Sequence, residues 1–446
     1  MKKEKPILST LSTIISSNII MIVGIATGII VTRSLGPELK GEFANLKLIM
    51  SLYAPFLLFG YQGGVLFYGL RQKLDLQQFF YTGAAMSVAM GLLCMPILAL
   101  FAQNGLLGKI VQNTSPLNTW LVLVTIPILF LNTYIDSVTR VYSLFRAANF
   151  RLIIAALVSL VFYLVLWLTI GINITLAIVG FLLGQTASLI SSLFFVTKKL
   201  RVLFIWQGKY IFYPFTYGYK ASLNLFIAKT NDKIDQVILT FFLSPAAFAF
   251  YAVGVGLSNL VTVLPSSYTQ VFFNQMASRS LEESLSLYTR TQRITFSLTT
   301  LAALVIIILA YPMVYVMYGT AFADAAWVVV LYTPGLIFHM ATRLTSNFFS
   351  GQGKPLKNSL VHSIGIAAGL PFYFWFIPKY GINGAAMAST ISYIATFCFS
   401  FLQLNLDYGV SLKDVIIPQK RDLRYVKEQI LKIPFFNKII LKLSGL

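Results

Sequence analysis

Long apolar stretches recur along almost the whole chain and restrict its fold more than any other feature. A helix needs about 20 apolar residues to span a bilayer, and about twelve such stretches can be distinguished. They lie at residues 10–32, 44–70, 78–102, 117–146, 150–170, 174–197, 217–243, 246–275, 291–317, 324–350, 358–378 and 382–406. These stretches do not alternate polar and apolar residues as barrel strands do. The sequence therefore predicts an all-α, polytopic membrane protein with about twelve transmembrane helices.

The distribution of basic residues indicates an orientation. The net charge is +20, which in a soluble protein would suggest nucleic acid, but here the basic residues follow the loops and no nucleic-acid partner is expected. One set of loops holds most of them, whereas the alternate loops hold only Arg33, Lys40, Lys47, Lys109 and Lys379. The positive-inside rule then places both termini in the cytoplasm. After Pro418 the tail mixes basic and apolar residues, which favours a helix on the cytoplasmic membrane surface over a disordered tail.

Three short matches recur in the same order a little over two hundred residues apart. Leu35-Gly36-Pro37 matches Leu243-Ser244-Pro245, Gly171-Ile172-Asn173 matches Gly381-Ile382-Asn383, and the segment Asp136–Arg140 matches His339–Arg343. With six spans in each half, the halves enter the membrane in the same direction, as parallel repeats do. We expect an N-terminal lobe at 1–200, a C-terminal lobe at 201–410 and a basic tail at 411–446. Such repeats form two lobes that can rock, so that the cleft between them opens first to one side of the membrane and then to the other. An inherited duplication without this alternating access is the alternative.

The sequence offers no metal or nucleotide site. Cys94 and Cys398 lie inside predicted spans, and neither they nor the two histidines have partners at metal-ligand spacing. The chain also lacks a P-loop. We expect no cofactor and no enzyme activity. The protein is expected to be a transporter, and the ions that could couple to it are H⁺ and Na⁺.

Charged residues inside apolar stretches identify the candidate site. Lys229, Asp232, Lys233 and Asp235 lie near the centre of the stretch 217–243. A charge at bilayer depth costs somewhere between ~2.5 and ~10 kcal/mol unless it faces a polar interior. Asn224, Asn231 and Asp235 share one face of the predicted helix, and the remaining three charges gather on roughly the opposite side. This pattern predicts a charged cavity inside the membrane.

Two further polar stripes have helical spacing. Asn132, Asp136 and Arg140 form one, and His339, Arg343 and Asn347 form the other. Because arginine forks and lysine ammonium groups suit phosphate oxygens, the predicted contacts to an anionic substrate such as a diphosphate are Arg140, Arg343, Lys229, Lys233, Asn224 and Asn231. The carboxylates that could couple an ion are Asp235, Asp136 and Asp232. Local ion pairs, Asp136 with Arg140 and Lys229 with Asp232 and Lys233, are the structural alternative.

Several motifs carry a family resemblance. They are Thr32-Arg33-Ser34-Leu35-Gly36-Pro37 with Gly41-Glu42-Phe43-Ala44, the glycines 60, 63 and 64 before Arg71, the stretch Asp235–Tyr251, Tyr318-Gly319 with Phe322 and Ala325, and Tyr380-Gly381-Ile382-Asn383-Gly384-Ala385-Ala386. With them, nearly the whole chain resembles the polysaccharide biosynthesis flippases of the O-antigen (Wzx-like) type. These belong to the multidrug/oligosaccharidyl-lipid/polysaccharide (MOP) exporter superfamily. One departure is Phe273-Asn274, where that family often has Phe-Pro.

The resemblance implies a substrate, a membrane and partners. The substrate would be an undecaprenyl-diphosphate-linked oligosaccharide, flipped from the cytoplasmic to the outer leaflet of a bacterial or archaeal cytoplasmic membrane for lipopolysaccharide or exopolysaccharide synthesis. The protein would be a monomer in the lipid bilayer and could work with a polysaccharide polymerase and chain-length machinery. The alternatives are a multidrug exporter or a lipid II flippase of the same fold and, from another class, a membrane glycosyltransferase or ligase.

Overall fold

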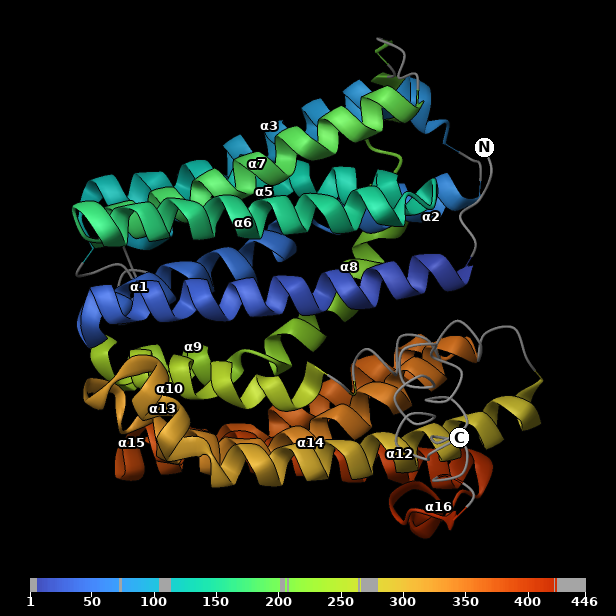
Figure 1. The fold of residues 1–446 in the computed structure, drawn as a ribbon. Coiled ribbons are helices and arrows are strands. Elements are labelled where there is room, and N and C mark those ends of the chain that lie inside the picture. The colour runs from blue at the N-terminus through green and yellow to red at the C-terminus, as the bar shows by residue number, and fades with distance from the viewer. Residues whose placement is uncertain are drawn as a thin grey trace, which may run out of the picture. The chain divides into compact units, whose positions relative to one another are not determined.

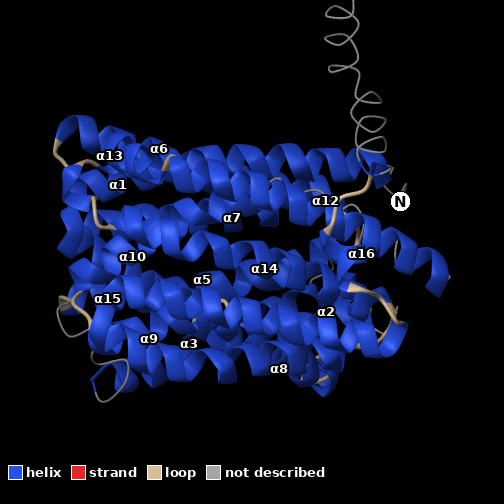
Figure 2. Ribbon diagram, turned by 90° about the horizontal axis from the view of Figure 1, so that it is seen from below, coloured by secondary structure: helices blue, strands red, loops and turns tan. Residues whose placement is uncertain are grey.

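The computed structural model describes residues 6–71, 74–103, 114–200, 205–206, 208–263, 265, 280–420 and 422. Over these ranges the chain is helical and has no β-strand (Figure 2). Nine of the described helices are long and apolar enough to cross a membrane. The predicted all-α, polytopic membrane fold is therefore confirmed.

Figure 1 shows the helices in chain order, from blue to red. The first six long elements are α1 (Pro6–Leu57), α2 (Tyr61–Leu70), α3 (Leu76–Gln103), α5 (Pro116–Val141), α6 (Phe145–Thr169) and α7 (Ile174–Leu200). They are followed by α8 (Phe215–Asn231), α9 (Ile234–Phe242), α10 (Pro245–Ser258), α12 (Leu281–Ile308), α13 (Ala310–Tyr318), α14 (Ala325–Gly351), α15 (Pro355–Tyr408) and α16 (Leu412–Ile416). Single 3₁₀ turns occur at Gly208–Tyr210 (η1), Asn259–Thr262 (η2) and Thr320–Phe322 (η3).

Two of the long elements each join residues of two predicted spans: α15 contains both of its spans, whereas α1 contains the span 10–32 and the first part of 44–70. α1 is interrupted at Gly36, where φ is 68°, and α15 is interrupted at Gly381, where φ is 57°. Left-handed backbone of this kind is open to glycine at little steric cost. Pro37, directly after the first break, has the fixed φ that suits the first position of a helix. Each break therefore separates two helical segments that the sequence analysis treats as separate stretches.

The structure corrects several predicted stretches. The stretch 44–70 is divided between α1, which ends at Leu57, and α2, which begins at Tyr61, and the stretch 291–317 is divided between α12 and α13. The stretch 217–243 is not one helix, because α8 ends at Asn231 and α9 begins at Ile234. The stretch 246–275 begins as α10 and changes to the 3₁₀ turn η2, and most of its remainder lies outside the described residues. The predicted surface helix after Pro418 also lies largely outside them.

The chain divides into two compact units. The first comprises residues 1–257, 309–330 and 369–389, and the second comprises 258–308, 331–368 and 390–446. The division into repeat-related lobes stays a prediction.

Aromatic side chains dominate one core of the first unit. Phe79, Phe80, Phe130 and Tyr134 on α3 and α5 are almost completely buried. The Tyr134 hydroxyl donates to the carbonyl of Phe80 at 3.0 Å. This bond satisfies the phenol where water cannot reach it, as a buried tyrosine requires.

In the second unit, a buried ion pair attaches the chain after α16 to α12. Arg293 Nε and Nη2 donate to the two carboxylate oxygens of Asp422 at 2.7 and 2.9 Å, and its Nη1 donates to the carbonyl of Asp414 at 2.8 Å. The two charged side chains are 2% and 4% exposed. Leu287, Leu344 and Val415 pack in the adjoining core. The beginning of the tail is thus part of the folded second unit.

Candidate functional site

The second segment of α1 carries two lysines, of which Lys40 is half-buried and Lys47 is exposed. Lys40 and Lys47 are seven residues apart, which is about two helical turns, so they lie on one face of the segment. Both were counted with the loop residues, although Lys47 also falls in the predicted stretch 44–70, and the structure places both in the helix that resumes after Gly36. The break at Gly36 thus places both lysines in a second helical segment of α1 instead of a loop.

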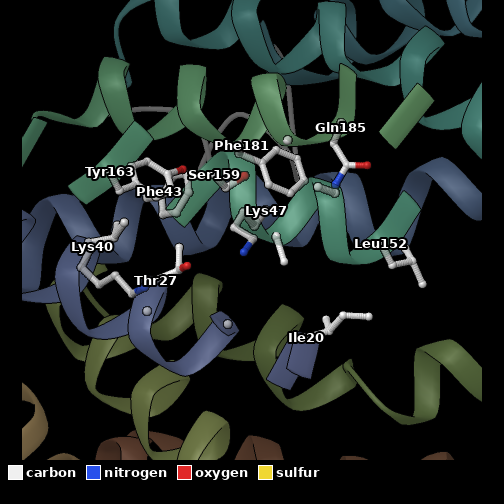
Figure 3. Close-up of a pocket in the computed structure, with 16 residues that line it drawn as sticks. Ile20, Thr27, Lys40, Phe43, Lys47, Leu152, Ser159, Tyr163, Phe181 and Gln185 are labelled. Atoms are coloured by element: carbon white, nitrogen blue, oxygen red, sulfur yellow. The ribbon is translucent and has the colours of Figure 1, made fainter. Parts of the chain in front are cut away.

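These lysines line a cavity of about 380 Å³ between α1, α6 and α7 (Figure 3). Its other polar side chains are those of Thr27, Ser159, Tyr163 and Gln185. None of the sixteen lining residues, all within the described part of the chain, is acidic. The cavity therefore combines positive charge with uncharged hydrogen-bonding groups.

The glycines along the cavity differ in the space around them. A Cβ atom added at Gly24 or Gly28 on α1 would meet no atom within 4 Å. A Cβ atom added at Gly184 on α7, by contrast, would lie 2.2 Å from Ser159 Oγ on α6. Small residues let membrane helices approach closely. Hence α6 and α7 pack tightly, whereas the glycines of α1 leave space in front of it.

The lysine ammonium groups have aromatic neighbours and no carboxylate partner in the described chain. Lys47 Nζ lies 5.3 Å from the ring centroid of Phe181 and 5.6 Å from that of Phe43. Lys40 Nζ lies 5.8 Å from the Phe43 centroid. Lys47 is repelled electrostatically both by Lys40 and by Lys233 of the predicted site. An anion in the cavity would relieve this repulsion, because opposite charges attract.

The predicted charges of the stretch 217–243 lie around the break between α8 and α9. Lys229 is in the last turn of α8 and is exposed, and Asp235 is in the first turn of α9. These positions suit the partial charges of helix ends, which favour cations at the C-terminus and anions at the N-terminus. Lys233, at the N-cap of α9, donates to the side-chain carbonyl of Gln236 at 3.2 Å. Asp232 caps α8 and is half-buried.

Asp235 is the most enclosed of the predicted ion-coupling carboxylates, at 2% exposed. Its Oδ2 accepts a hydrogen bond from the Tyr251 hydroxyl at 2.5 Å and one from Ser389 Oγ at 3.4 Å. Its Oδ1 accepts from the backbone N–H of Gln236 at 2.8 Å. Tyr373 in turn donates to Ser389 Oγ at 3.1 Å. Three elements, α9, α10 and α15, thus meet at one carboxylate within the first unit.

The stripe on α5 is engaged in local ion pairs. Asp136 accepts from Arg140 Nε at 2.7 Å and from Arg151 Nη2 of α6 at 2.6 Å. The Arg151 side chain is only 10% exposed and also donates to Ser188 Oγ of α7 at 3.3 Å. The sequence analysis considered the Asp136–Arg140 pair as an alternative but missed Arg151, because a buried arginine two turns into a helix has no local sequence signal.

The remaining predicted residues lie elsewhere in the fold. Arg343 on α14 is exposed in the second unit, and its Nη1 lies 3.9 Å from Met340 Sδ. Asn231, at the end of α8, is buried. Asn224 lies within α8, but its side chain is outside what the structure describes. The structure thus does not gather the predicted residues at one site. Lys40 and Lys47 were not among the predicted site residues.

Comparison with known proteins identifies the kind of fold and the family model that matches. Residues 30–327 match the model of a family described as polysaccharide biosynthesis protein. An uncharacterized membrane protein of Methanocaldococcus jannaschii is 25% identical over 238 residues, which cover 51% of this chain and 47% of that protein. The match therefore spans about half the length of this relative.

Solved transporters share the fold at low sequence identity. The lipid II flippase MurJ, in an inward closed conformation, has a TM-score of 0.73 at 16% identity, over 98% of this chain and 99% of that one. An inward-facing multidrug resistance MATE transporter has a TM-score of 0.70 at 16% identity, over 87% and 94%. A transporter from Pyrococcus furiosus, whose reverse pocket polarity suggests a different function, has a TM-score of 0.65 at 16% identity, over 90% and 94%. All three likenesses concern the fold, which is that of the MOP superfamily.

Proposed function

This chain belongs to the polysaccharide biosynthesis protein family, and we propose that it is a flippase for a polyprenyl-diphosphate-linked oligosaccharide. In this proposal the protein works in the cytoplasmic membrane, with both termini in the cytoplasm. It moves the lipid-linked sugar to the outer leaflet, where a polysaccharide polymerase and chain-length machinery use it. Undecaprenyl diphosphate is the carrier that the resemblance implies.

The observation that carries the proposal is the cavity with Lys40 and Lys47. Two ammonium groups in the wall of a cavity inside a membrane protein are expensive unless they meet water or an anion. A diphosphate offers several oxygens that can each accept from a lysine. Thr27, Ser159 and Gln185 add uncharged partners along the same cavity, which would suit phosphate oxygens or sugar hydroxyls. The charge of the cavity and the chemistry of the carrier are therefore complementary.

The sequence-based candidates extend this site. Lys233 interacts electrostatically with Lys47, so we propose that it contributes to the same positive field. Arg140, Arg343 and Lys229 are exposed and stay proposed contacts for the diphosphate at other stages of transport. Asn224 and Asn231 stay proposed contacts for the sugar or the diphosphate.

A multidrug exporter of the same fold is the main alternative. A binding site for cationic drugs would gain from acidic walls, because opposite charges attract and like charges repel. The described cavity wall has two lysines and no acidic residue. Its charge therefore favours an anionic substrate over a cationic one.

Binding of purified protein to undecaprenyl diphosphate tests the proposal. We expect Lys40→Gln and Lys47→Gln each to weaken binding about 10-fold, since a hydrogen bond to a charged group is worth about 1.5 kcal/mol or more. Lys198→Gln is the matched control, because Lys198 lies on α7 but outside the cavity lining. In cells, loss of the protein should cause the lipid-linked oligosaccharide to accumulate. Equal affinity in all three variants would contradict the proposed site.

We further propose that Asp235 holds the H⁺ or Na⁺ that drives the cycle. Asp136 is occupied by two arginines and Asp232 is less enclosed, so Asp235 is the best placed of the three candidate carboxylates. Its neighbours are hydroxyl and amide donors, which can stabilise the carboxylate in its charged form.

An imposed gradient tests this role of Asp235. Asp235→Asn keeps the shape of the side chain and removes its charge. In liposomes with a fluorescent lipid-linked sugar, we expect this variant to bind undecaprenyl diphosphate normally and to lose its response to a pH or Na⁺ gradient. A variant that responds like the wild type would remove Asp235 from the coupling mechanism.

A further inference from the structure

Arg33 on α1 makes an unusual contact with the end of α13, and both lie in the first compact unit. Its Nε donates to the carbonyl of Met317 at 2.9 Å, and its Nη2 donates to the carbonyl of Val316. Val316 and Met317 are 283 and 284 positions from Arg33 in the sequence. The contact therefore joins the end of the first segment of α1 to a much later helix.

The contact completes the C-terminus of α13. The last carbonyls of a helix have no partner within it and carry a partial negative charge. α13 has no basic residue in its last turn. The N–H of Gly319 satisfies only the carbonyl of Tyr315. The guanidinium of Arg33 thus takes the two carbonyls that follow, through charge-assisted hydrogen bonds.

A second contact brings α1 and α10 together close by. A Cβ atom added at Gly41 would lie 1.7 Å from the carbonyl oxygen of Pro245, the first residue of α10. The two backbones can therefore approach this closely only with glycine at position 41. In Figures 1 and 2 the α10 and α13 labels lie toward the same end of the molecule. That end corresponds to the loops after the first, seventh and ninth predicted spans.

The same segment of α1 carries both contacts and the cavity lysines. Arg33 precedes the break at Gly36 by three residues, and Lys40 directly precedes Gly41. A movement of α10 or α13 away from α1 must therefore break contacts that adjoin Lys40. The Lys/Arg distribution predicts that these contacts lie on the outer side of the membrane.

We propose that Arg33 with the α13 carbonyls, and Gly41 with Pro245, form a latch that holds this side of the protein closed. Release of the latch would open the cavity toward that side. The inference goes beyond the proposed function, because it concerns the conformational equilibrium of the ligand-free protein and is independent of the substrate.

Distances between spin labels test the latch. Glu38 and Thr320 are exposed and flank it, so each is replaced by cysteine and labelled in protein whose Cys94 and Cys398 are changed to alanine. Pulsed electron–electron double resonance on ligand-free protein in lipid nanodiscs then gives the distribution of distances between the two labels. We expect a single short distance in the otherwise wild-type protein.

Substitutions at the two contacts should shift that distribution. Gly41→Ala forbids the close approach to Pro245, so we expect the short distance to be lost in favour of longer ones. Arg33→Gln removes the charge that caps α13 and should give a mixture of short and long distances. Arg33→Lys keeps the charge and should give a smaller share of long distances than Arg33→Gln. Gly256→Ala is the matched control, because it lies on α10 and its Cβ would meet nothing within 4 Å.

The outcomes separate the latch from its alternatives. Unchanged distances in both Gly41→Ala and Arg33→Gln would overturn the proposal and leave Arg33 as a purely structural cap. If Gly41→Ala does not yield folded protein, the two Arg33 variants decide. Binding of undecaprenyl diphosphate, measured separately, reports on the proposed substrate, so a negative result there leaves the distance measurement intact.

Discussion

Asp136 shares its two carboxylate oxygens between two arginines of unequal exposure. The Arg140 side chain is 60% exposed and the Arg151 side chain is 10% exposed. An exposed ion pair contributes little, whereas removal of a partner from a buried pair leaves an uncompensated charge. The two arginines therefore differ in what they do for the fold, although they bind the same carboxylate.

We expect this difference to appear in thermal stability. Arg151→Ala should lower the free energy of unfolding by about 2 kcal/mol, less than the roughly 3–5 kcal/mol of a fully buried pair, because Asp136 keeps Arg140. Arg140→Ala should lower it by less than about 1 kcal/mol. Thermal unfolding of the purified variants in detergent, followed by intrinsic fluorescence, measures both. Equal losses would mean that burial does not distinguish the two pairs.

At the scale of the element, α1 combines three features of the candidate site. Its first segment presents Gly24 and Gly28 to the cavity, its break at Gly36 redirects the chain, and its second segment brings Lys40 and Lys47 back along the same cavity. One element thus provides both the empty space of the site and its charge. A change in α1 can therefore alter the volume of the cavity without altering its charge.

Gly28→Leu uses this separation. The added side chain would extend into open space, and leucine is a better helix former than glycine by about 1 kcal/mol. We expect a melting temperature at or above that of the wild type, together with lost binding of undecaprenyl diphosphate. Gly256→Leu, which also has open space at its Cβ, should keep both properties. Normal binding by Gly28→Leu would mean that the substrate does not occupy this cavity.

The same element shows how far sequence analysis reaches. Apolar stretches of about 20 residues are sufficient to predict spans, because few other structures bury such a run. Lys40 lies between the predicted stretches 10–32 and 44–70, but the helix continues through it, because a single left-handed glycine at position 36 is enough to redirect the chain. The break after Asn231 also escaped prediction, since lysine, aspartate and asparagine are tolerated within helices as well as at their ends.

Part of the candidate site could be predicted and part could not. The charges around Asp235 are visible in the sequence because they interrupt an apolar stretch, and the structure encloses that carboxylate. Its partners Tyr251 and Ser389 are 16 and 154 residues away. Tyr251 ends a stretch that carries the family resemblance, but nothing in the sequence pairs it or Ser389 with Asp235. Such partners follow from tertiary packing alone.

At the scale of the whole molecule, the Lys/Arg asymmetry of the loops predicts which side faces the cytoplasm. The fold is that of a multi-pass membrane protein, and its direction in the membrane stays a prediction. Asn113 and Gln207, in two loops outside the described residues, belong to opposite sides under this prediction.

Thiol labelling of intact cells tests the orientation. In a background without Cys94 and Cys398, a cysteine placed at Asn113 should react with an impermeant maleimide from outside. One placed at Gln207 should react only after the membrane is permeabilised. The opposite pattern would reverse the orientation and put the Arg33 contact on the cytoplasmic face.

The capping of α13 by Arg33 has a consequence for how mutations distribute in this family. Both acceptors are main-chain carbonyls, which every amino acid supplies. The side chains at 316 and 317 can therefore vary freely as long as α13 remains a helix, and no compensating change at position 33 is needed. A pairwise covariation signal between the two segments would be absent even though they touch. Alanine scanning would locate the contact from the arginine side only.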